Sequence, residues 1–203
     1  MKKNKTSKNW LKKQHRDQYV RKSKIFGYRS RSAYKLIEMD QKFKFLDRRK
    51  TLIDLGSSPG GWSQVAAKKI NKGKVLAVDI KDMEKINNVE FLKGDFLKVE
   101  VHEKILNYFD KKVDIVISDM AADTSGNKDL DSFKTGELCL AAMELAYKIL
   151  NKEGVFISKL FMGSIFAEID KKANEIFKKV VKYKPLASRK ESKEIYIYCR
   201  GIS

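Results

Sequence analysis

The sequence has few of the residues that mark exported, membrane-spanning or metal-binding proteins. Its 203 residues include two cysteines, two histidines and two prolines. Cys139 and Cys199 lack any CxxC or Cys/His spacing, so we expect inert thiols, no metal site and a reducing compartment. No run of about 18 apolar residues could cross a bilayer, and no apolar stretch follows the basic N-terminus as in a signal peptide. These absences predict a soluble, cytoplasmic protein.

Acidic residues are also scarce, since 26 Asp and Glu accompany 44 Lys and Arg, for a formal net charge of +18. This charge exceeds what solubility requires and indicates a polyanionic partner. Residues 1–34 hold twelve basic residues and one acid, Asp17, a net +11. Aromatic residues lie between these charges: Trp10, Tyr19, Phe26, Tyr28 and Tyr34. Because cations neutralise phosphates and aromatic rings stack on bases, the segment favours RNA over a membrane.

Other interpretations of this segment stay open, namely a solvated, partly disordered tail or, less well supported by its Lys-rich composition, an organelle transit peptide. We expect a flexible, RNA-contacting basic tail over residues 1–25 and one folded domain over residues 26–203, with a monomer as the default. The candidate RNA contacts are Lys12, Lys13, Arg16, Arg21, Lys22, Arg29 and Arg31.

Past the tail, apolar strand-like runs alternate with helical patterns. Strands are expected at 51–55, 75–79, 89–92, 113–119, 155–160 and 195–199. Helices are expected at about 32–43, 62–73, 100–109, 133–150 and 165–180, with a polar loop at 121–132 and a break at 151–154. This alternation predicts an α/β fold with a mainly parallel central sheet, helices on both faces, and ligands at the carboxyl ends of the strands.

A glycine turn follows the first strand, in Asp54-Leu55-Gly56-Ser57-Ser58-Pro59-Gly60-Gly61-Trp62. Glycine permits positive φ and close approach of the backbone to a ligand, and a helix N-terminus favours negative groups. The spacing Gly-x-x-x-Gly-Gly is not that of a dinucleotide turn, and Trp62-Ser63 stands where a P-loop needs Lys followed by Ser or Thr. The turn therefore predicts a nucleotide-type cofactor site, against the simpler alternative of strand-to-helix punctuation.

Four acids occupy successive strand ends: Asp54, Asp79, Asp95 and Asp119. Asp79 lies where an acid can bind ribose hydroxyls, and Asp95 is placed to meet an adenine. Each acid alone would more often form a turn, but four at one edge of a sheet favour a cofactor site. Lys159 lies within an otherwise apolar strand and so needs a charge partner or a catalytic task, unless it is an edge-strand or snorkelling lysine.

Several motifs follow one another in order from about residue 20 to the end. They are Gly27-Tyr28-Arg29-Ser30-Arg31-Ser32-Ala33-Tyr34-Lys35-Leu36, Asp54-Leu55-Gly56 with Pro59-Gly60-Gly61-Trp62-Ser63-Gln64, Gly94-Asp95-Phe96, Ser118-Asp119-Met120-Ala121, Ser158-Lys159-Leu160-Phe161 and Ser192-Lys193-Glu194-Ile195-Tyr196. Together they resemble the FtsJ-type ribosomal RNA methyltransferase family. The sequence departs from the family at Ser57-Ser58, where alanines are usual. Relatives that methylate transfer RNA tend to have Cys for Gly56 and Ser for Gly61, so the resemblance favours ribosomal RNA.

The resemblance implies a Rossmann-like fold that binds S-adenosylmethionine (SAM), with the glycine turn at the methionine end of the cofactor. It implies methylation of the ribose 2′-hydroxyl of a uridine in large-subunit ribosomal RNA, with the assembled large subunit as the expected partner. The implied cofactor-binding residues are Asp54, Gly56, Gly60, Gly61, Trp62, Asp79, Asp95 and Asp119. The implied catalytic residues are Lys35, Asp119, Lys159 and Glu194.

Lys159 is the candidate general base for the ribose hydroxyl. Burial and the neighbouring cation Lys35 would favour its neutral form, whereas Asp119 and Glu194 would favour the charged form. The sequence leaves this conflict open, and a charged Lys159 would instead stabilise the developing alkoxide. Two rival classes are weaker: a non-catalytic RNA-binding protein has no need of the four charged residues, and a small-molecule methyltransferase has no use for the net charge of +18.

Overall fold

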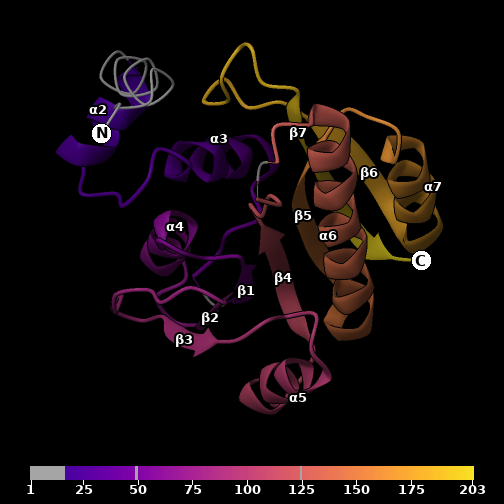
Figure 1. The fold of residues 1–203 in the computed structure, drawn as a ribbon. Coiled ribbons are helices and arrows are strands. Elements are labelled where there is room, and N and C mark those ends of the chain that lie inside the picture. Colours follow the sequence, from indigo (N-terminus) through magenta and orange to yellow (C-terminus); the bar gives the residue numbers. More distant parts are fainter. Residues whose placement is uncertain (1–16, 49, 124) are drawn as a thin grey trace.

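The computed structural model describes residues 17–48, 50–123 and 125–203, and its strands form one seven-stranded sheet in the order β3-β2-β1-β4-β5-β7-β6 (Figure 1). The strands are β1 (Thr51–Leu55), β2 (Lys74–Asp79), β3 (Glu90–Lys93), β4 (Val113–Ser118), β5 (Leu150–Phe161), β6 (Phe177–Tyr183) and β7 (Glu194–Ile202). The helices are α2 (Gln18–Ile25), α3 (Ala33–Phe43), α4 (Gly61–Lys69), α5 (Val99–Tyr108), α6 (Lys128–Ile149) and α7 (Phe166–Ile176).

The sheet is mainly parallel, as the alternation of strands and helices predicted. Strands β1 to β5 pair in parallel, while β7 inserts antiparallel between β5 and β6. The strand order reverses between β1 and β4. In open α/β sheets this switch point, at the carboxyl ends of the strands, is where ligands bind.

Helices cover both faces of the sheet and make two cores. Successive strand residues point to opposite faces, so Ile53 of β1 packs into the core under α5, α6 and α7, whereas Leu52 packs into the core under α3 and α4. Figure 1 shows α6 and α7 together on one side and α3 and α4 apart from them. The predicted α/β fold with helices on both faces is thus confirmed.

The N-terminal segment differs from the expected flexible tail over residues 1–25. Residues 18–25 form helix α2, because the side chain of Asp17 accepts hydrogen bonds from the amides of Tyr19 and Val20 and thus caps the first turn. Asp17 also pairs with Arg31 at 3.0 Å and with Arg189 at 3.7 Å. Cap and ion pairs fix this part of the segment against the folded domain, while residues 1–16 lie outside the described residues.

Several element boundaries differ from those predicted. The helix expected at 62–73 ends at Lys69, and β7 is longer than the expected 195–199. Helix α6 begins inside the expected 121–132 loop, because the side chain of Asn127 accepts hydrogen bonds from the amides of Asp129 and Leu130. The expected break at 151–154 is part of β5, which starts directly after α6 with an irregular register against β4. The expected 165–180 helix ends at Ile176, and Phe177 begins β6, a strand the sequence reading missed. No helix in the described part of the chain has the length and hydropathy of a membrane span.

Candidate active site

A cavity of about 420 Å³ lies at the carboxyl ends of the central strands, within the range of about 300–1,000 Å³ usual for small-molecule sites. Its walls come from the segments that follow β1, β2, β3 and β4, and from β5. The lining residues are Gly56, Ser58, Val78, Asp79, Ile80, Lys81, Gly94, Asp95, Phe96, Asp119, Met120, Ala121, Ala122, Asp123, Leu138 and Lys159. The structure therefore brings together four predicted cofactor residues, Gly56, Asp79, Asp95 and Asp119, with the candidate base Lys159.

The turn after β1 is built around two glycines with positive φ. Gly56 has φ +72° and Gly60 has φ +109°, a backbone region that favours glycine. A Cβ at Gly56 would lie 2.1 Å from Cγ of Met120, so glycine also lets the loop after β4 approach the turn. The carboxylate of Asp79 accepts hydrogen bonds from the amides of Ser58 and Lys81, both at 2.8 Å. This fixes the acid at the rim of the cavity.

Asp54 lies deeper, beside a second small cavity of about 60 Å³. It is 1% exposed, and it accepts a 2.6 Å hydrogen bond from the hydroxyl of Ser63 in the first turn of α4. Burial raises the pKa of Asp54 from 3.8 to about 7, against the effect of this hydrogen bond. The carboxyl of Asp54 is therefore poised to change its protonation state near neutral pH.

Four more of the predicted cofactor residues line the small cavity. Gly61 and Trp62 line this cavity alone, whereas Gly56 and Asp119 line both cavities. Trp62 is 2% exposed, and its indole N–H donates to the carbonyl of Ser32 at 2.8 Å, so this side chain also joins α4 to the start of α3. Gly60 lines neither of the two cavities; it is the N-cap residue of α4, where a Cβ would lie 2.7 Å from Ile86. Its contribution is to shape the turn.

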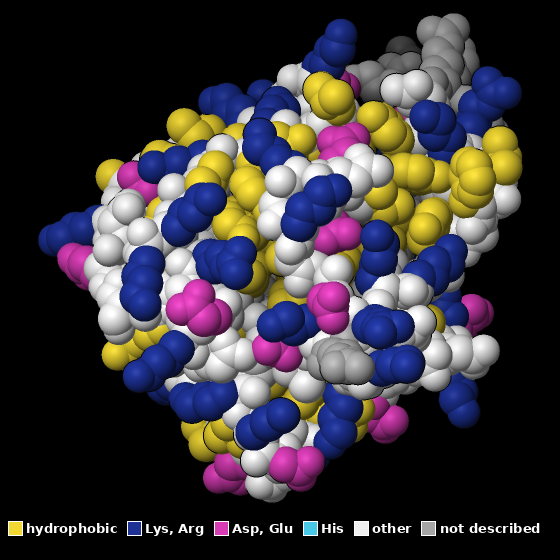
Figure 2. Space-filling view, turned by 180° about the vertical axis from the view of Figure 1, so that it is seen from behind, with side chains coloured by type: hydrophobic (Ala, Val, Ile, Leu, Met, Phe, Trp, Pro, Cys, Tyr) yellow, Lys and Arg dark blue, Asp and Glu magenta, His cyan; other side chains and the backbone are white. Residues whose placement is uncertain are grey.

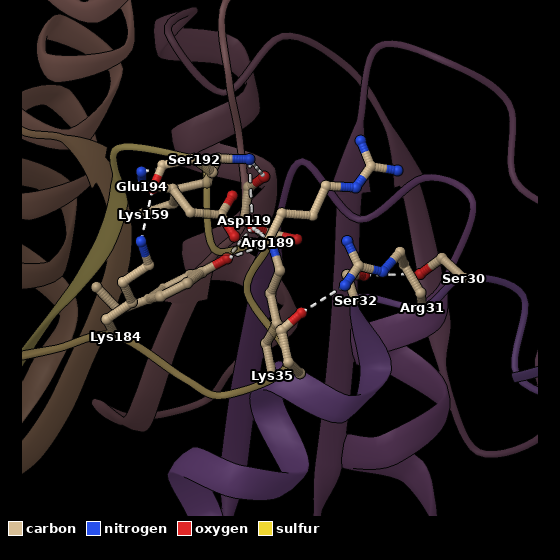
Figure 3. A network of polar contacts seen from close by, with 12 residues as sticks. Ser30, Arg31, Ser32, Lys35, Asp119, Lys159, Lys184, Arg189, Ser192 and Glu194 are labelled. Carbon is tan, nitrogen blue, oxygen red and sulfur yellow. Dashed lines mark hydrogen bonds and ion pairs between the residues drawn. The ribbon is translucent and has the colours of Figure 1, made fainter. Parts of the chain in front are cut away.

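The four predicted catalytic residues meet in one charged cluster (Figure 3), and two of them, Asp119 and Lys159, line the larger cavity. Nζ of Lys159 lies 3.2 Å from Oδ1 of Asp119 and donates to the backbone carbonyl of Asp119 at 2.5 Å. Nζ of Lys35 lies 2.9 Å from Oε1 of Glu194 and 3.8 Å from Oδ1 of Asp119. Asp119 is thus shared by the two lysines, and of these two Lys159 is the one that lines the larger cavity.

Tyr196 is a member of this cluster that sequence reasoning did not single out. Its ring is fully buried, and its hydroxyl accepts from Lys35 at 2.9 Å and donates to Asp119 at 2.5 Å. Burial and the neighbouring carboxylates of Asp119 and Glu194 raise the pKa of Tyr196 well above its ordinary value, so the hydroxyl keeps its proton. A usable signal was its position two residues after Glu194, on the same side of a strand.

The electrostatics of Asp119 follow from its neighbours. Burial opposes ionisation of this carboxyl, but the ammonium groups of Lys159 and Lys35 and the hydrogen bond from Tyr196 outweigh it and hold the pKa of Asp119 below its ordinary value. The side chain is therefore an anion at neutral pH. A fixed carboxylate between two lysines can orient both ammonium groups toward a third reactant.

The predicted RNA contacts fall into three groups. Lys12, Lys13 and Arg16 lie outside the described residues. Arg21 and Lys22 are exposed on α2. Arg29 and Arg31 are already engaged within the chain: Arg29 donates to the carbonyls of Pro59, Glu84 and Lys85, and Arg31 donates to the carbonyl of Ala187. The guanidinium groups of Arg29 and Arg31 thus brace the cofactor turn and the segment before β7.

The two cysteines are buried, free thiols, as expected from their spacing. Burial raises the pKa of the Cys139 thiol to about 11, and it raises that of Cys199 well above its ordinary value. Both thiols are therefore protonated at neutral pH, which makes them poor nucleophiles.

The site residues fit SAM, a cationic nucleoside. The larger cavity offers carboxylates at the rim, where Asp79 can accept from a ribose diol, and the smaller cavity places Asp54 and Asp119 where a cationic group would sit. Both cavities meet at Gly56 and Asp119. A cavity at the switch point of a mainly parallel sheet, with Lys159 and Asp119 at its edge, is the arrangement expected of a SAM-dependent methyltransferase.

The comparisons with known proteins specify the family. Residues 28–202 match the model of the FtsJ-like methyltransferases, and the chain belongs to this family. It is 52% identical over 200 residues to the ribosomal RNA large subunit methyltransferase E of Pelagibacter ubique, covering 98% of each chain, and 44% identical to the enzyme of the same name from Rickettsia akari, covering 95% and 87%. A crystal structure described as a ribosomal RNA methyltransferase from Plasmodium falciparum superposes with a TM-score of 0.78, at 34% identity, over 86% of this chain and 98% of the other.

Proposed function

We propose that this protein transfers a methyl group from SAM to the ribose 2′-hydroxyl of a uridine in large-subunit ribosomal RNA. The observation that carries the proposal is the cluster of Lys35, Asp119, Lys159 and Glu194 beside the cofactor cavity. The relatives with 52% and 44% identity, both named ribosomal RNA large subunit methyltransferase E, support the substrate.

The sulfonium of SAM supplies a methyl group that is already activated, so the protein must mainly position the hydroxyl and manage its proton. Lys159 has the position for this task, because it reaches the cofactor cavity and is oriented by two oxygens of Asp119. We assign to Lys159, in its uncharged amine form, the removal of the proton from the 2′-hydroxyl as the oxygen attacks the methyl group, with S-adenosylhomocysteine as the leaving group. The ammonium group that results is then held by Asp119.

The other three residues act through Lys159. Asp119 holds its ammonium group, and Lys35 lies 3.8 Å from the same carboxylate oxygen of Asp119, Oδ1. Glu194 fixes Lys35 at 2.9 Å, so the cluster alternates positive and negative charges. A buried set of paired charges is costly for stability, and fixed orientation of the reacting groups is the gain that offsets this cost.

The RNA-binding surface includes the N-terminal basic segment in this proposal. On α2, Arg21, Lys22 and Lys24 are exposed, and Phe26 after the helix is 63% exposed, so cations for phosphates and a ring for a base stand side by side. Figure 2 shows Lys and Arg side chains spread over a whole face of the molecule, with Asp and Glu between them. Such a distribution suits a large folded RNA better than a short linear one.

The cofactor cavities and the catalytic cluster come from one chain, so the proposed working unit is a monomer. Its proposed substrate is the assembled large subunit, and its place of action is then the cytoplasm, where bacterial large subunits are found.

The test is transfer of a labelled methyl group from SAM to large subunits that lack the modification, with free ribosomal RNA, transfer RNA and capped RNA in parallel reactions. The expected result is label on one ribose of the large-subunit RNA, absent with Lys159→Ala. Label on transfer RNA or capped RNA instead would show that the proposed substrate is wrong, while the proposed reaction would stand. No transfer to any RNA by a chain that binds SAM tightly would overturn the proposal.

A further inference from the structure

Another cavity of about 250 Å³ lies next to the catalytic cluster and is lined by none of the four charged residues. It lies between the loop after β4, the start of α6, the end of β5 and the segment before β7. Its lining residues are Ala121, Ala122, Lys128, Asp129, Asp131, Ser132, Phe161, Met162, Glu191 and Lys193.

Two structural relationships place this cavity beside the reacting atoms. Ala121 and Ala122 line both this cavity and the cofactor cavity, so they form a wall between the two. Phe161 follows Lys159 by two residues on β5, which puts both side chains on the same side of the strand, and Phe161 is the register partner of Glu194 on β7. A group bound here is therefore an immediate neighbour of the catalytic cluster.

One buried polar atom of this cavity has no hydrogen-bond partner in the part of the chain that the structure describes. Ser132 is 7% exposed, and its Oγ makes no hydrogen bond within the described residues. A buried hydroxyl without a partner is uncommon and costly. Gly163 makes room for the Ser132 hydroxyl, because a Cβ at residue 163 would lie 2.3 Å from Oγ of Ser132. The hydroxyl is thus an available hydrogen-bonding group inside a partly apolar cavity whose rim includes Phe161 and Met162.

The charges around the cavity argue against a phosphate as its ligand. Three acids and two lysines line it: Asp129, Asp131 and Glu191 with Lys128 and Lys193. The excess of negative charge is local, since the whole chain carries +18. The cavity therefore lacks the surplus of cations that binds a phosphate. A neutral heteroaromatic ring can instead stack on an apolar side chain and hydrogen-bond along its polar edge.

We propose that this cavity holds the nucleobase of the target nucleotide, with its face against Phe161 and its polar edge at the hydroxyl of Ser132. This inference rests on the proposed function. In a nucleotide, the carbon that carries the base is bonded to the carbon that carries the 2′-hydroxyl, so a ribose placed at Lys159 must have its base directly beside the cluster. Taking the base out of the RNA stack exposes the hydroxyl to Lys159 and selects the nucleotide.

The test combines two changes, a substitution in the cavity and removal of the base from the target nucleotide, and compares their separate and joint effects on methyl transfer. Methyl transfer is measured on large subunits reconstituted with RNA that carries either the target uridine or an abasic ribose at that position. The cavity variants are Ser132→Ala and Ser132→Leu, which remove the hydroxyl and fill the cavity. The matched control is Ser188→Ala, because Ser188 is also buried with an unpartnered Oγ but lies outside the cavity. Melting temperature and calorimetric SAM affinity establish that each variant folds.

On the uridine substrate, Ser132→Ala is expected to lower kcat/KM about three- to ten-fold, and Ser132→Leu by more. On the abasic substrate both variants are expected to match the unmodified chain, since two changes that remove the same contact are not additive. Ser188→Ala is expected to change neither rate. Equal losses on both substrates, or no loss with either Ser132 variant, would overturn the cavity assignment and leave the proposed function standing. No transfer by the unmodified chain to the uridine substrate would overturn both.

Discussion

The hydroxyl of Tyr196 donates a 2.5 Å hydrogen bond to Oδ1 of Asp119. This bond joins β7, the last strand in the sequence, to the loop after β4. The same hydroxyl accepts from Lys35, so Tyr196 bridges a cation and an anion that are themselves 3.8 Å apart. A neutral hydroxyl in this position sets the geometry of the charged cluster without altering its net charge. Tyr196 is thus a positioning residue for Lys159, acting through Asp119.

Substitution Tyr196→Phe tests this bridge. It leaves the ring in its packing against Trp62 but removes the hydroxyl, so Asp119 loses a donor that helps to keep its pKa low. We expect kcat to fall about 10- to 100-fold, because small displacements of catalytic groups are costly. SAM affinity is expected to change little. The acidic limb of the pH–rate profile is expected to move to higher pH, since Asp119 becomes easier to protonate.

The control for Tyr196→Phe is Tyr198→Phe, on the same face of β7. Tyr198 is also buried, but it stacks on Phe43, away from the cluster. A similar rate loss and an unmoved pH profile in both variants would show that the effect comes from the packing of β7 and not from the bridge.

Lys159→Ala tests the assignment of the base. General acid–base catalysis contributes about 10²–10⁴-fold, and we expect kcat to fall by at least that factor while SAM affinity stays within a few-fold. Lys50→Ala is the matched control, since Nζ of Lys50 lies 3.2 Å from Asp114, the same separation as between Lys159 and Asp119, but outside the cavity. Near-normal methyl transfer by Lys159→Ala in single-turnover assays would remove Lys159 from the mechanism.

The parallel strands were the most predictable part of the fold. The sequence predicted β1 with its observed bounds, Thr51–Leu55, because strands buried on both faces appear as continuous apolar runs. Strand β6 was missed because Phe177 and Val180 fit a helical stripe as well as a strand, and its pairing with β7 decides between them. Edge strands depend on such partners, which a local pattern does not contain.

The site was predicted unevenly for a similar reason. The charged residues stand in recognisable motifs, whereas the function of Tyr196 depends on contacts with Lys35 and Asp119, which lie 161 and 77 positions away in the sequence. The engagement of Arg31 by Asp17 and Ala187 was equally hidden. Net charge indicated that a basic segment binds RNA, but it did not distinguish the arginines that brace the fold from those that are exposed.

Asp79→Asn tests the proposed ribose contact. Asn keeps the size of the side chain but removes the negative charge. It also leaves one acceptor where Asp79 offers two, Oδ2 to the amide of Ser58 and Oδ1 to the amide of Lys81, so one of these two hydrogen bonds is lost. We expect SAM binding to weaken by about 1–3 kcal/mol through loss of charge-assisted hydrogen bonds. Asp82→Asn, on the exposed loop that follows, is the control and is expected to bind SAM normally. Unchanged affinity of Asp79→Asn by calorimetry would move the ribose contact to another residue.

Asp54→Asn tests the protonation of the buried acid beneath the glycine turn. In the folded state the pKa of Asp54 is raised from 3.8 to about 7, so the folded chain binds this proton more tightly than the unfolded chain does. The stability that this protonation contributes is present below pH 4 and is lost as the pH rises through 7. Asn cannot ionise, so the variant is expected to escape this loss.

The unfolding free energy of Asp54→Asn minus that of the unmodified chain is therefore expected to increase between pH 4 and pH 7 and to level off above pH 7. The total increase is up to roughly 4 kcal/mol. This increase is measured by urea unfolding at a series of pH values without SAM. Groups that the substitution leaves unaffected titrate equally in the two chains, so their contributions cancel in the difference. Parallel curves of unfolding free energy over this range would mean that the pKa of Asp54 is not raised in the folded chain. Contacts of the ionised carboxylate, such as the hydrogen bond from Ser63, would then compensate the cost of its burial.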